Sequence, residues 1–258
     1  MRGENLPQAY LISTGSELLT GEVEDTNAVF LAQRLTELGL QVIGKSIVGD
    51  DRANMERVFR MALESADVVV STGGLGPTFD DLTKAVVCEI MNCPLQIRAD
   101  EEKKLRELFA RRNWNMPENN LKQVMFPPEA AVLNNRFGTA PGMYLKKDGK
   151  IIILLPGPPR EMIPMYTNEV LPMLKGDCAP VAKPLLTRTI KIMGPGESQV
   201  EQLVKQQIAD LADCNVGIRA VLGEIHVKLK ADASNPGAVE RLDKAVREIA
   251  AILGANVW

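Results

Sequence analysis

Three short polar loops follow apolar runs of the sequence, and they contain the residue types that bind phosphate and divalent cations. The loops span residues 13–17, 49–51 and 71–83, and the third reads Ser-Thr-Gly-Gly-Leu-Gly-Pro-Thr-Phe-Asp-Asp-Leu-Thr. Backbone amides of glycine-rich segments receive phosphate oxygens, whereas carboxylates hold Mg²⁺ or a similar ion. Together the loops predict a site for a phosphorylated ligand and a hard cation.

Each loop taken alone has a simpler interpretation. The aspartates are also typical N-caps and first-turn residues that complement a helix dipole, and they are Asp50, Asp51, Asp80 and Asp81. The glycine loop is not a dinucleotide-binding fingerprint, because Phe79 stands where its third glycine belongs. No Gly-Lys-Ser or Gly-Lys-Thr of a Walker loop follows a glycine-rich segment either. The prediction therefore depends on all three loops lying at one edge.

The elements that position these loops alternate between apolar runs and amphipathic stretches. The apolar runs predict strands at residues 9–12, 42–48, 67–70, 131–133, 142–145 and 151–155. The amphipathic stretches predict helices over about residues 28–38, 50–62, 80–91, 100–112 and 160–173. This order implies a mostly parallel sheet with right-handed crossovers. Ligands bind beyond the carboxyl ends of such strands, where all three loops are expected.

A small, proline-rich segment at residues 175–184 predicts a linker to a second domain. Beyond it the predicted order is strand, helix, two strands and helix, at residues 185–193, 197–211, 216–221, 225–231 and 236–253. We therefore expect one α/β domain over residues 1–175 and one small α+β domain over residues 176–258.

Composition excludes several classes of function. The 258 residues carry 30 Lys and Arg against 33 Asp and Glu, a net charge of −3, and only 4% are aromatic. Nucleic-acid binding through bulk charge or stacking is therefore not expected. His226 is the only histidine and is interpreted as a solvated residue of a strand face. The four cysteines lack C-x-x-C spacing and are expected to be reduced and mostly buried.

No stretch approaches the roughly 20 apolar residues of a membrane helix, and residues 1–5 lack an apolar signal core. We therefore expect a cytoplasmic protein that has no membrane partner.

Several groups of residues along nearly the whole chain carry a family resemblance. They are Thr14-Gly15-Ser16-Glu17-Leu18-Leu19 with Gly21 and Asp25-Thr26-Asn27; Val48-Gly49-Asp50-Asp51; Gly73-Gly74-Leu75-Gly76-Pro77-Thr78 with Asp80-Asp81-Leu82-Thr83; Asn135 with Gly138-Thr139-Ala140-Pro141-Gly142; Leu155-Pro156-Gly157 with Pro159 and Glu161-Met162; and Gly196-Glu197-Ser198. Together they closely resemble the CinA (competence and damage-inducible protein A) family, whose first domain belongs to the MogA-like, molybdopterin-binding superfamily.

The resemblance implies a three-layer α/β/α MogA-like domain with a mostly parallel sheet, followed by a small α+β KH-like domain. It implies an ADP-ribose pyrophosphatase that releases AMP and ribose 5-phosphate. A divalent metal (Mg, Mn or Co) is the implied cofactor, with a monovalent cation as a further candidate, and the implied assembly is a homodimer. Longer family members add a nicotinamide-nucleotide deamidase domain. This sequence stops at Trp258, about where that domain's connecting segment would begin, so deamidase activity is not expected.

On this basis the loops receive roles. Asp81, Asp80 and Glu17 are the expected catalytic residues, and Asp50, Asp80 and Asp81 the expected metal contacts. The glycine amides and the helix expected from Asp80 should cradle the diphosphate. The expected substrate-binding residues are Thr14, Gly15, Ser16, Asn27, Gly73, Gly74, Gly76, Thr78, Asn135, Gly138 and Thr139.

Two residues depart from the family pattern. Ser16 replaces a common aspartate, so one possible carboxylate ligand is missing. Glu17 is therefore favoured as the additional metal ligand or general base. Arg136 replaces a frequent proline and is interpreted as a solvated loop arginine in preference to a phosphate contact.

Two other functions stay open at this point. The first alternative is that this edge of the sheet binds molybdopterin or a nucleotide without hydrolysis, or transfers adenylate, as in some superfamily members. RNA binding by the second domain is disfavoured, because Gly194-Pro195-Gly196 lacks the G-x-x-G spacing of a KH clamp and runs into Glu197.

Overall fold

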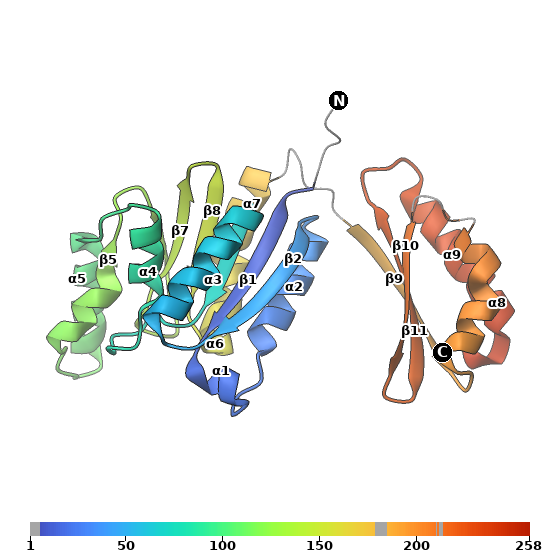
Figure 1. Cartoon of the computed structure of the whole chain (residues 1–258), viewed down its shortest axis with the longest axis horizontal. Coiled ribbons are helices and arrows are strands. Elements are labelled where there is room, and N and C mark those ends of the chain that lie inside the picture. Colours follow the sequence, from blue (N-terminus) through green and yellow to red (C-terminus); the bar gives the residue numbers. More distant parts are fainter. Residues whose placement is uncertain (1–5, 179–184, 210, 212–213) are drawn as a thin grey trace. The chain divides into compact units, whose positions relative to one another are not determined.

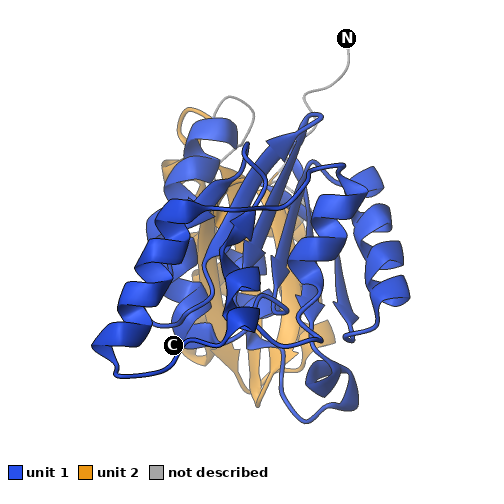
Figure 2. Cartoon of the chain, turned by 90° about the vertical axis from the view of Figure 1, so that its left-hand side faces the viewer, with its two compact units in different colours: residues 1–36, 40–182 blue, residues 37–39, 183–258 orange. Residues whose placement is uncertain are grey.

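The protein is described here by a computed structural model, which covers residues 6–178, 185–209, 211 and 214–258 (Figure 1). The chain forms two compact units (Figure 2). Unit 1 consists of residues 1–36 and 40–182, and unit 2 of residues 37–39 and 183–258.

Unit 1 is built on a six-stranded sheet in the order β2-β1-β3-β8-β7-β6. Its strands are β1 Gln8–Thr14, β2 Gln41–Val48, β3 Val68–Thr72, β6 Ala131–Leu133, β7 Gly142–Lys147 and β8 Lys150–Leu155. Strands β2, β1, β3 and β8 are parallel, whereas β7 runs antiparallel to both of its neighbours. The prediction of a mostly parallel sheet is therefore confirmed. Strands β7 and β8 form a hairpin that turns at Asp148 and Gly149, both of which have positive φ.

Helices lie on both sides of this sheet, as Figure 2 shows for unit 1. They are α1 Ser16–Thr20, α2 Thr26–Glu37, α3 Arg52–Ser65, α4 Thr83–Ile90, α5 Ala99–Arg111, α6 Pro159–Met165 and α7 Leu171–Cys178, with a π-helical turn η2 Tyr166–Val170 between the last two. Helix α3 starts at Arg52 because the Asp51 carboxylate accepts a hydrogen bond from the Asn54 N–H. The arrangement is the expected three-layer α/β/α domain.

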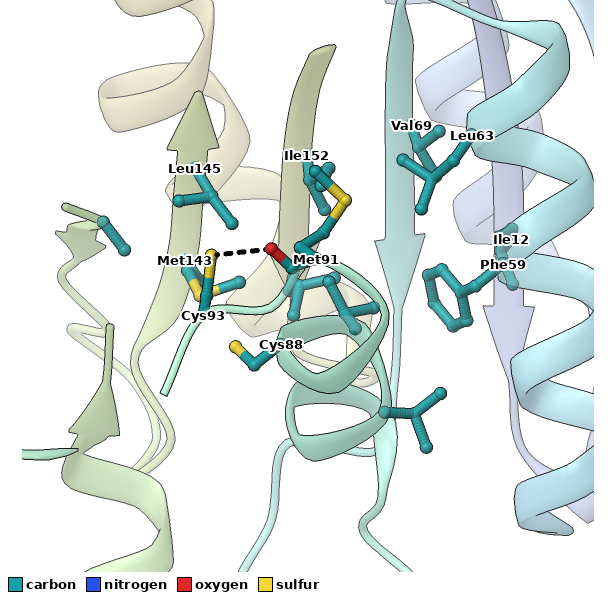
Figure 3. Close-up of a cluster of buried hydrophobic side chains, with 14 of the residues drawn as sticks. Ile12, Phe59, Leu63, Val69, Cys88, Met91, Cys93, Met143, Leu145 and Ile152 are labelled. Carbon is teal, nitrogen blue, oxygen red and sulfur yellow. Dashed lines mark hydrogen bonds between the residues drawn. The ribbon is translucent and has the colours of Figure 1, made fainter. Parts of the chain in front are cut away.

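The core of unit 1 follows from the sequence of its strands. All five residues of β3 are buried, as expected for a central parallel strand that is covered on both faces. Phe59 of α3 packs in one cluster with Ile12 of β1 and Val69 of β3, and Cys88 of α4 belongs to the same cluster (Figure 3). This packing holds the strand ends, and therefore the three loops, in fixed positions.

Three details of unit 1 differ from the sequence prediction. Helix α4 begins at Thr83 and not near Asp80, because the Asp81 carboxylate accepts the Thr78 N–H and closes a separate turn. Helix α7 continues to Cys178, across the predicted domain boundary, and residues 179–184 of the predicted linker lie outside the described residues. The sequence did not reveal strands β4 Gln96–Ile97 and β5 Met125–Phe126 or the 3₁₀ helix η1 Glu118–Val124.

Unit 2 has the predicted β-α-β-β-α order. Its elements are β9 Leu185–Met193, α8 Glu197–Ala209, β10 Cys214–Val221, β11 Glu224–Asp232, α9 Ala238–Leu253 and a 3₁₀ turn η3 Gly254–Asn256. The antiparallel sheet has the order β10-β11-β9, and its alternate residues pack with apolar residues of α8 and α9. The His226 side chain is only 15% exposed and is hydrogen-bonded to Glu224 Oε2 at 2.8 Å, so the solvated histidine was a wrong prediction.

Cys88, Cys93 and Cys178 are free, buried thiols, as predicted. Within the described residues, no helix has the length and apolar character needed to cross a lipid bilayer.

Candidate functional site

The three predicted loops meet at one pocket, at the edge of the sheet where β1, β2 and β8 end (the lower edge of unit 1 in Figure 1). The pocket has a volume of about 460 Å³, which suits a small-molecule ligand. Its floor is the glycine loop after β3. A Cβ atom on Gly74 would overlap with Thr83 Oγ1, and one on Gly73 would overlap with the Thr14 carbonyl oxygen. Both residues also have positive φ, so glycine is required at each position.

The glycine loop presents backbone amides that nothing else uses. Among the described residues, the N–H groups of Gly74, Leu75 and Gly76 have no hydrogen-bond acceptor, and all three residues line the pocket. Successive N–H groups of this kind form a concave anion-binding site. The Gly73 N–H is not part of it, because this group donates to the Leu155 carbonyl at 3.0 Å. The Gly73 amide, which was expected to receive phosphate, is therefore already in use, whereas the unused Leu75 N–H was not predicted.

Asp80 and Asp81 both line the pocket but have different surroundings. Asp81 Oδ2 accepts hydrogen bonds from the N–H and the hydroxyl of Thr78, so this carboxylate braces the glycine loop. Asp80 Oδ1 is buried and has no hydrogen-bond partner within the described residues. The pKa of Asp80 is lowered, chiefly by the Thr78 hydroxyl and also by a backbone N–H and the nearby Lys122. One oxygen of the Asp80 carboxylate, Oδ1, is therefore left without a donor from the described part of the protein.

The second and first loops supply Asp50 and Glu17, which also line the pocket. Ser16 does not line it. Its N–H and hydroxyl donate to Asp50 Oδ2 at 3.0 Å and 2.7 Å. The serine that replaces a common aspartate therefore orients a neighbouring carboxylate, a role that the sequence did not indicate.

Several residues that were predicted to contact the substrate instead form hydrogen bonds to the protein's own backbone. The Thr14 hydroxyl lines the pocket but is buried and donates to the Thr72 carbonyl. Asn27 lies outside the pocket, where its Nδ2 donates to the Gly157 carbonyl at 2.6 Å and its Oδ1 is buried without a partner within the described chain. Asn135 also lies outside and holds the loop that contains Gly138 and Thr139, which do line the pocket. Gly15 and Thr78, two further expected substrate-binding residues, line the pocket.

Sequence reasoning missed part of the pocket wall. These residues are Arg112, Gln123, Phe137, Arg160 and Glu161, of which only Glu161 belonged to a quoted stretch. Gln123 Nε2 donates to Thr139 Oγ1 at 3.2 Å. The Gln123 carbonyl in turn accepts the Nζ of Lys84, a lysine that is only 5% exposed. Arg136 is exposed and does not line the pocket.

The charge of the pocket favours an anionic ligand only together with a cation. Five carboxylates and two guanidinium groups line it. The described residues contain no group of three or more His, Cys, Asp or Glu side chains that could hold a metal ion alone. Mg²⁺ is usually bound by one or two carboxylates together with substrate phosphates and water. The unpartnered Asp80 Oδ1 and the Ser16-oriented Asp50 fit such a shared site.

Two families match the chain in the same order as its two units. One, described as "Probable molybdopterin binding domain", matches residues 10–176. The other, described as "Damage-inducible protein CinA KH domain", matches residues 187–258. Together with the sheet order, these matches confirm the predicted fold of a molybdopterin-binding α/β domain followed by a small KH-like domain.

Individual proteins agree with these matches. A "CinA-like protein" of Syntrophomonas wolfei is 50% identical over 250 residues, which are 96% of this chain and 60% of the relative. A "Putative competence-damage inducible protein" of Desulforudis audaxviator is 38% identical over 97% of this chain and 60% of its own length. The crystal structure of CinA from Thermoplasma acidophilum, titled as of unknown function, is 35% identical with a TM-score of 0.59, and it covers 67% of this chain and 98% of that chain. The present chain spans about 60% of the length of the curated relatives it matches.

Proposed function

This chain belongs to the CinA family, and on that premise we propose that its pocket binds the phosphate groups of a nucleotide or a pterin together with a divalent cation. The observation that carries this proposal is the row of unused N–H groups at Gly74, Leu75 and Gly76. Amides fixed in advance pay no reorganisation cost when they receive phosphate oxygens. Helix α4 begins at Thr83, after this loop, and the positive end of its dipole also attracts a phosphate group.

Carboxylates beside a phosphate site repel the ligand unless a cation lies between them. Asp80 and Asp50 are the residues that we propose to hold this cation, and Asp81 mainly keeps the glycine loop in shape. When bound, a divalent cation would neutralise the phosphate oxygens and polarise their bonds to phosphorus. The alternative, an anion site without a cation, would leave the excess carboxylates of the pocket uncompensated.

The finer proposal is that the pocket hydrolyses ADP-ribose, the reaction that the resemblance to the CinA family implies. A water oxygen forms a bond to one phosphorus of the diphosphate, and the bond from that phosphorus to the bridging oxygen breaks. The products are AMP and ribose 5-phosphate. Glu17, a carboxylate without a hydrogen bond to another described side chain, is placed to accept the proton of the water. The amides of Gly74 to Gly76 hold the charge that develops on the phosphate oxygens.

Binding without hydrolysis is the second candidate. It is favoured by the description of the family that matches unit 1, which refers to molybdopterin binding. In this version a molybdopterin or a nucleotide is held at the same amides without a chemical step, or a bound molybdopterin receives the adenylyl group of ATP with release of pyrophosphate. We further propose a homodimer in the cytoplasm, on the resemblance and the sequence composition alone.

A product assay separates the two candidates. The protein is incubated with ADP-ribose and Mg²⁺, Mn²⁺ or Co²⁺, or with EDTA, and the products are resolved by chromatography. Metal-dependent release of AMP, lost in Asp80→Asn, supports hydrolysis. Tight binding of ADP or of a pterin phosphate by calorimetry, with no product from ADP-ribose, supports the binding candidate. Absence of both binding and product would contradict the proposal as a whole.

A further inference from the structure

Phe137 is an unusual residue for its position. It is the one aromatic side chain among the described residues that line the pocket, and it is 55% exposed. The chain contains only six phenylalanines, and Phe59, Phe109 and Phe126 are buried. An apolar ring left open to water forgoes the stabilisation that burial would give. Its exposed ring in the lining of the pocket is therefore a surface that a ligand can cover.

The backbone around Phe137 is held rigidly. Asn135 Oδ1 accepts hydrogen bonds from the Phe137 N–H at 3.0 Å and from the Gly138 N–H at 2.8 Å. Asn135 Nδ2 donates to the Ala140 carbonyl at 2.9 Å and to Glu161 Oε2 at 2.8 Å. The loop is thus tied to itself and to helix α6 before any ligand arrives. A ring on such a loop loses little conformational freedom on binding.

Phe137 and the glycine loop line the same pocket of about 460 Å³. The glycine loop offers amides for phosphate oxygens, whereas Phe137 offers an apolar, electron-rich face. A ligand that touches both must carry a phosphate group and a flat ring. Aromatic side chains bind such rings by stacking, because every base has a π face. Purine nucleotides and pterin phosphates share this chemistry.

Resting on the phosphate-binding function proposed above, we infer that Phe137 is the platform on which the planar heteroaromatic ring of the ligand stacks. It is therefore a specificity-determining residue, which separates ring-bearing phosphates from phosphates that lack a ring. Arg112 and Arg160 line the same pocket and have no carboxylate partner among the described residues, so they are available to offset ligand charge. The inference concerns the ring end of the ligand and adds no step to the reaction.

The test compares ligands with and without a ring on matched variants. Dissociation constants for ADP, neopterin phosphate and pyrophosphate are measured by calorimetry, with Mg²⁺ present, on the full chain. Phe137→Ala should weaken binding of a ring-bearing ligand by about 5- to 100-fold and change pyrophosphate binding less than about twofold. Phe137→Trp should retain the affinity for that ligand. Phe79→Ala removes a phenylalanine that is 92% exposed but does not line the pocket, so it should change none of the three.

Each pattern of affinity loss in Phe137→Ala leads to a different conclusion. Loss confined to ADP identifies a nucleotide base as the stacked ring, and loss confined to neopterin phosphate identifies a pterin. An equal loss for pyrophosphate, or no loss for any ligand, would overturn the inference about Phe137 and leave the phosphate site standing. Failure of the unmodified protein to bind any of the three would overturn both. A variant that keeps its pyrophosphate affinity has an intact glycine loop. A urea-unfolding midpoint of Phe137→Ala equal to that of the unmodified protein shows that an equal loss for pyrophosphate does not come from misfolding.

Discussion

Replacing Lys84 with methionine should stabilise unit 1 at neutral pH, because this lysine is buried without a carboxylate partner. Lys84 Nζ donates to the Gln123 carbonyl at 2.8 Å and lies 3.9 Å from the centre of the Phe126 ring. Burial lowers the pKa of Lys84 from 10.5 to about 7; Cys88 opposes this shift, and Lys122 adds to it. Keeping a proton on this group in the folded state is therefore unfavourable.

The size and the sign of the effect follow from the two pKa values. The unfolded chain keeps the proton up to about pH 10.5, whereas the folded chain loses it near pH 7. Each pKa unit of difference corresponds to about 1.4 kcal/mol, so charged Lys84 costs about 5 kcal/mol at pH values below 7. Between these pKa values the unfolded state binds more protons, so the cost falls by about 1.4 kcal/mol per pH unit as pH rises.

Lys84→Met removes this cost but leaves the Gln123 carbonyl without its donor, a loss of about 1–3 kcal/mol. We therefore expect the variant to be more stable than the unmodified chain by about 2–4 kcal/mol at pH 6.5. The difference should shrink steadily between pH 7 and 8.5. Urea unfolding followed by Trp114 fluorescence in a Trp258→Phe background reports unit 1 alone, since Trp258 is the only other tryptophan.

The pH window stops at 8.5 because burial also raises the pKa of Cys88 from 9.0 to about 12, which makes the folded state less stable as pH rises above 9. Lys150→Met is the matched control. Lys150 Nζ also donates to a backbone carbonyl, that of Ala66 at 2.8 Å, but from a half-buried position, so this variant should not be stabilising. A Lys84→Met variant that is no more stable at pH 6.5, or whose advantage does not change with pH, would refute the reasoning.

Two further predictions concern the pocket. Ser16→Ala should weaken Mn²⁺ binding in the presence of ADP by about 10- to 100-fold, because Asp50 loses the hydroxyl that orients it. Calorimetry checks this against Ser65→Ala, which removes a hydroxyl from the helix α3 surface. Equal affinities for the two variants would contradict the orienting role of the Ser16 hydroxyl. Gly74→Ala should lower the unfolding free energy by more than the roughly 1–2 kcal/mol that a positive φ costs, because its Cβ overlaps with Thr83. Gly149→Ala has a similar φ and open space, so equal losses in urea unfolding for the two variants would contradict this account.

Short-range patterns made much of the fold predictable. The run Val68–Val70 is apolar at every position, and it became a strand that is buried on both faces. The loops after β1, β2 and β3 reached one pocket because parallel strands place their carboxyl ends at the same edge. These features depend on residues that are close in sequence or on general rules of chain connection.

What the sequence did not reveal depends on contacts between distant residues. Asn27 braces Gly157, which is 130 residues away, and Lys84 holds the carbonyl of Gln123, which is 39 residues away. The start of helix α4 was misplaced for a local reason. Two consecutive aspartates are typical of a helix N-terminus, but Asp81 caps the turn at Thr78 instead. Polar residues near a site can contact the ligand or hold the residues that do, and their spacing alone does not distinguish these roles.

The central claim is that the amides of Gly74, Leu75 and Gly76 receive phosphate, and NMR titration of ¹⁵N-labelled protein with ADP and Mg²⁺ tests it most directly. The amide protons of these three residues should move downfield as they form hydrogen bonds to phosphate oxygens. The Gly73 amide already donates to the Leu155 carbonyl and should move much less. Saturable binding that leaves the amides of Gly74, Leu75 and Gly76 unshifted would contradict the account.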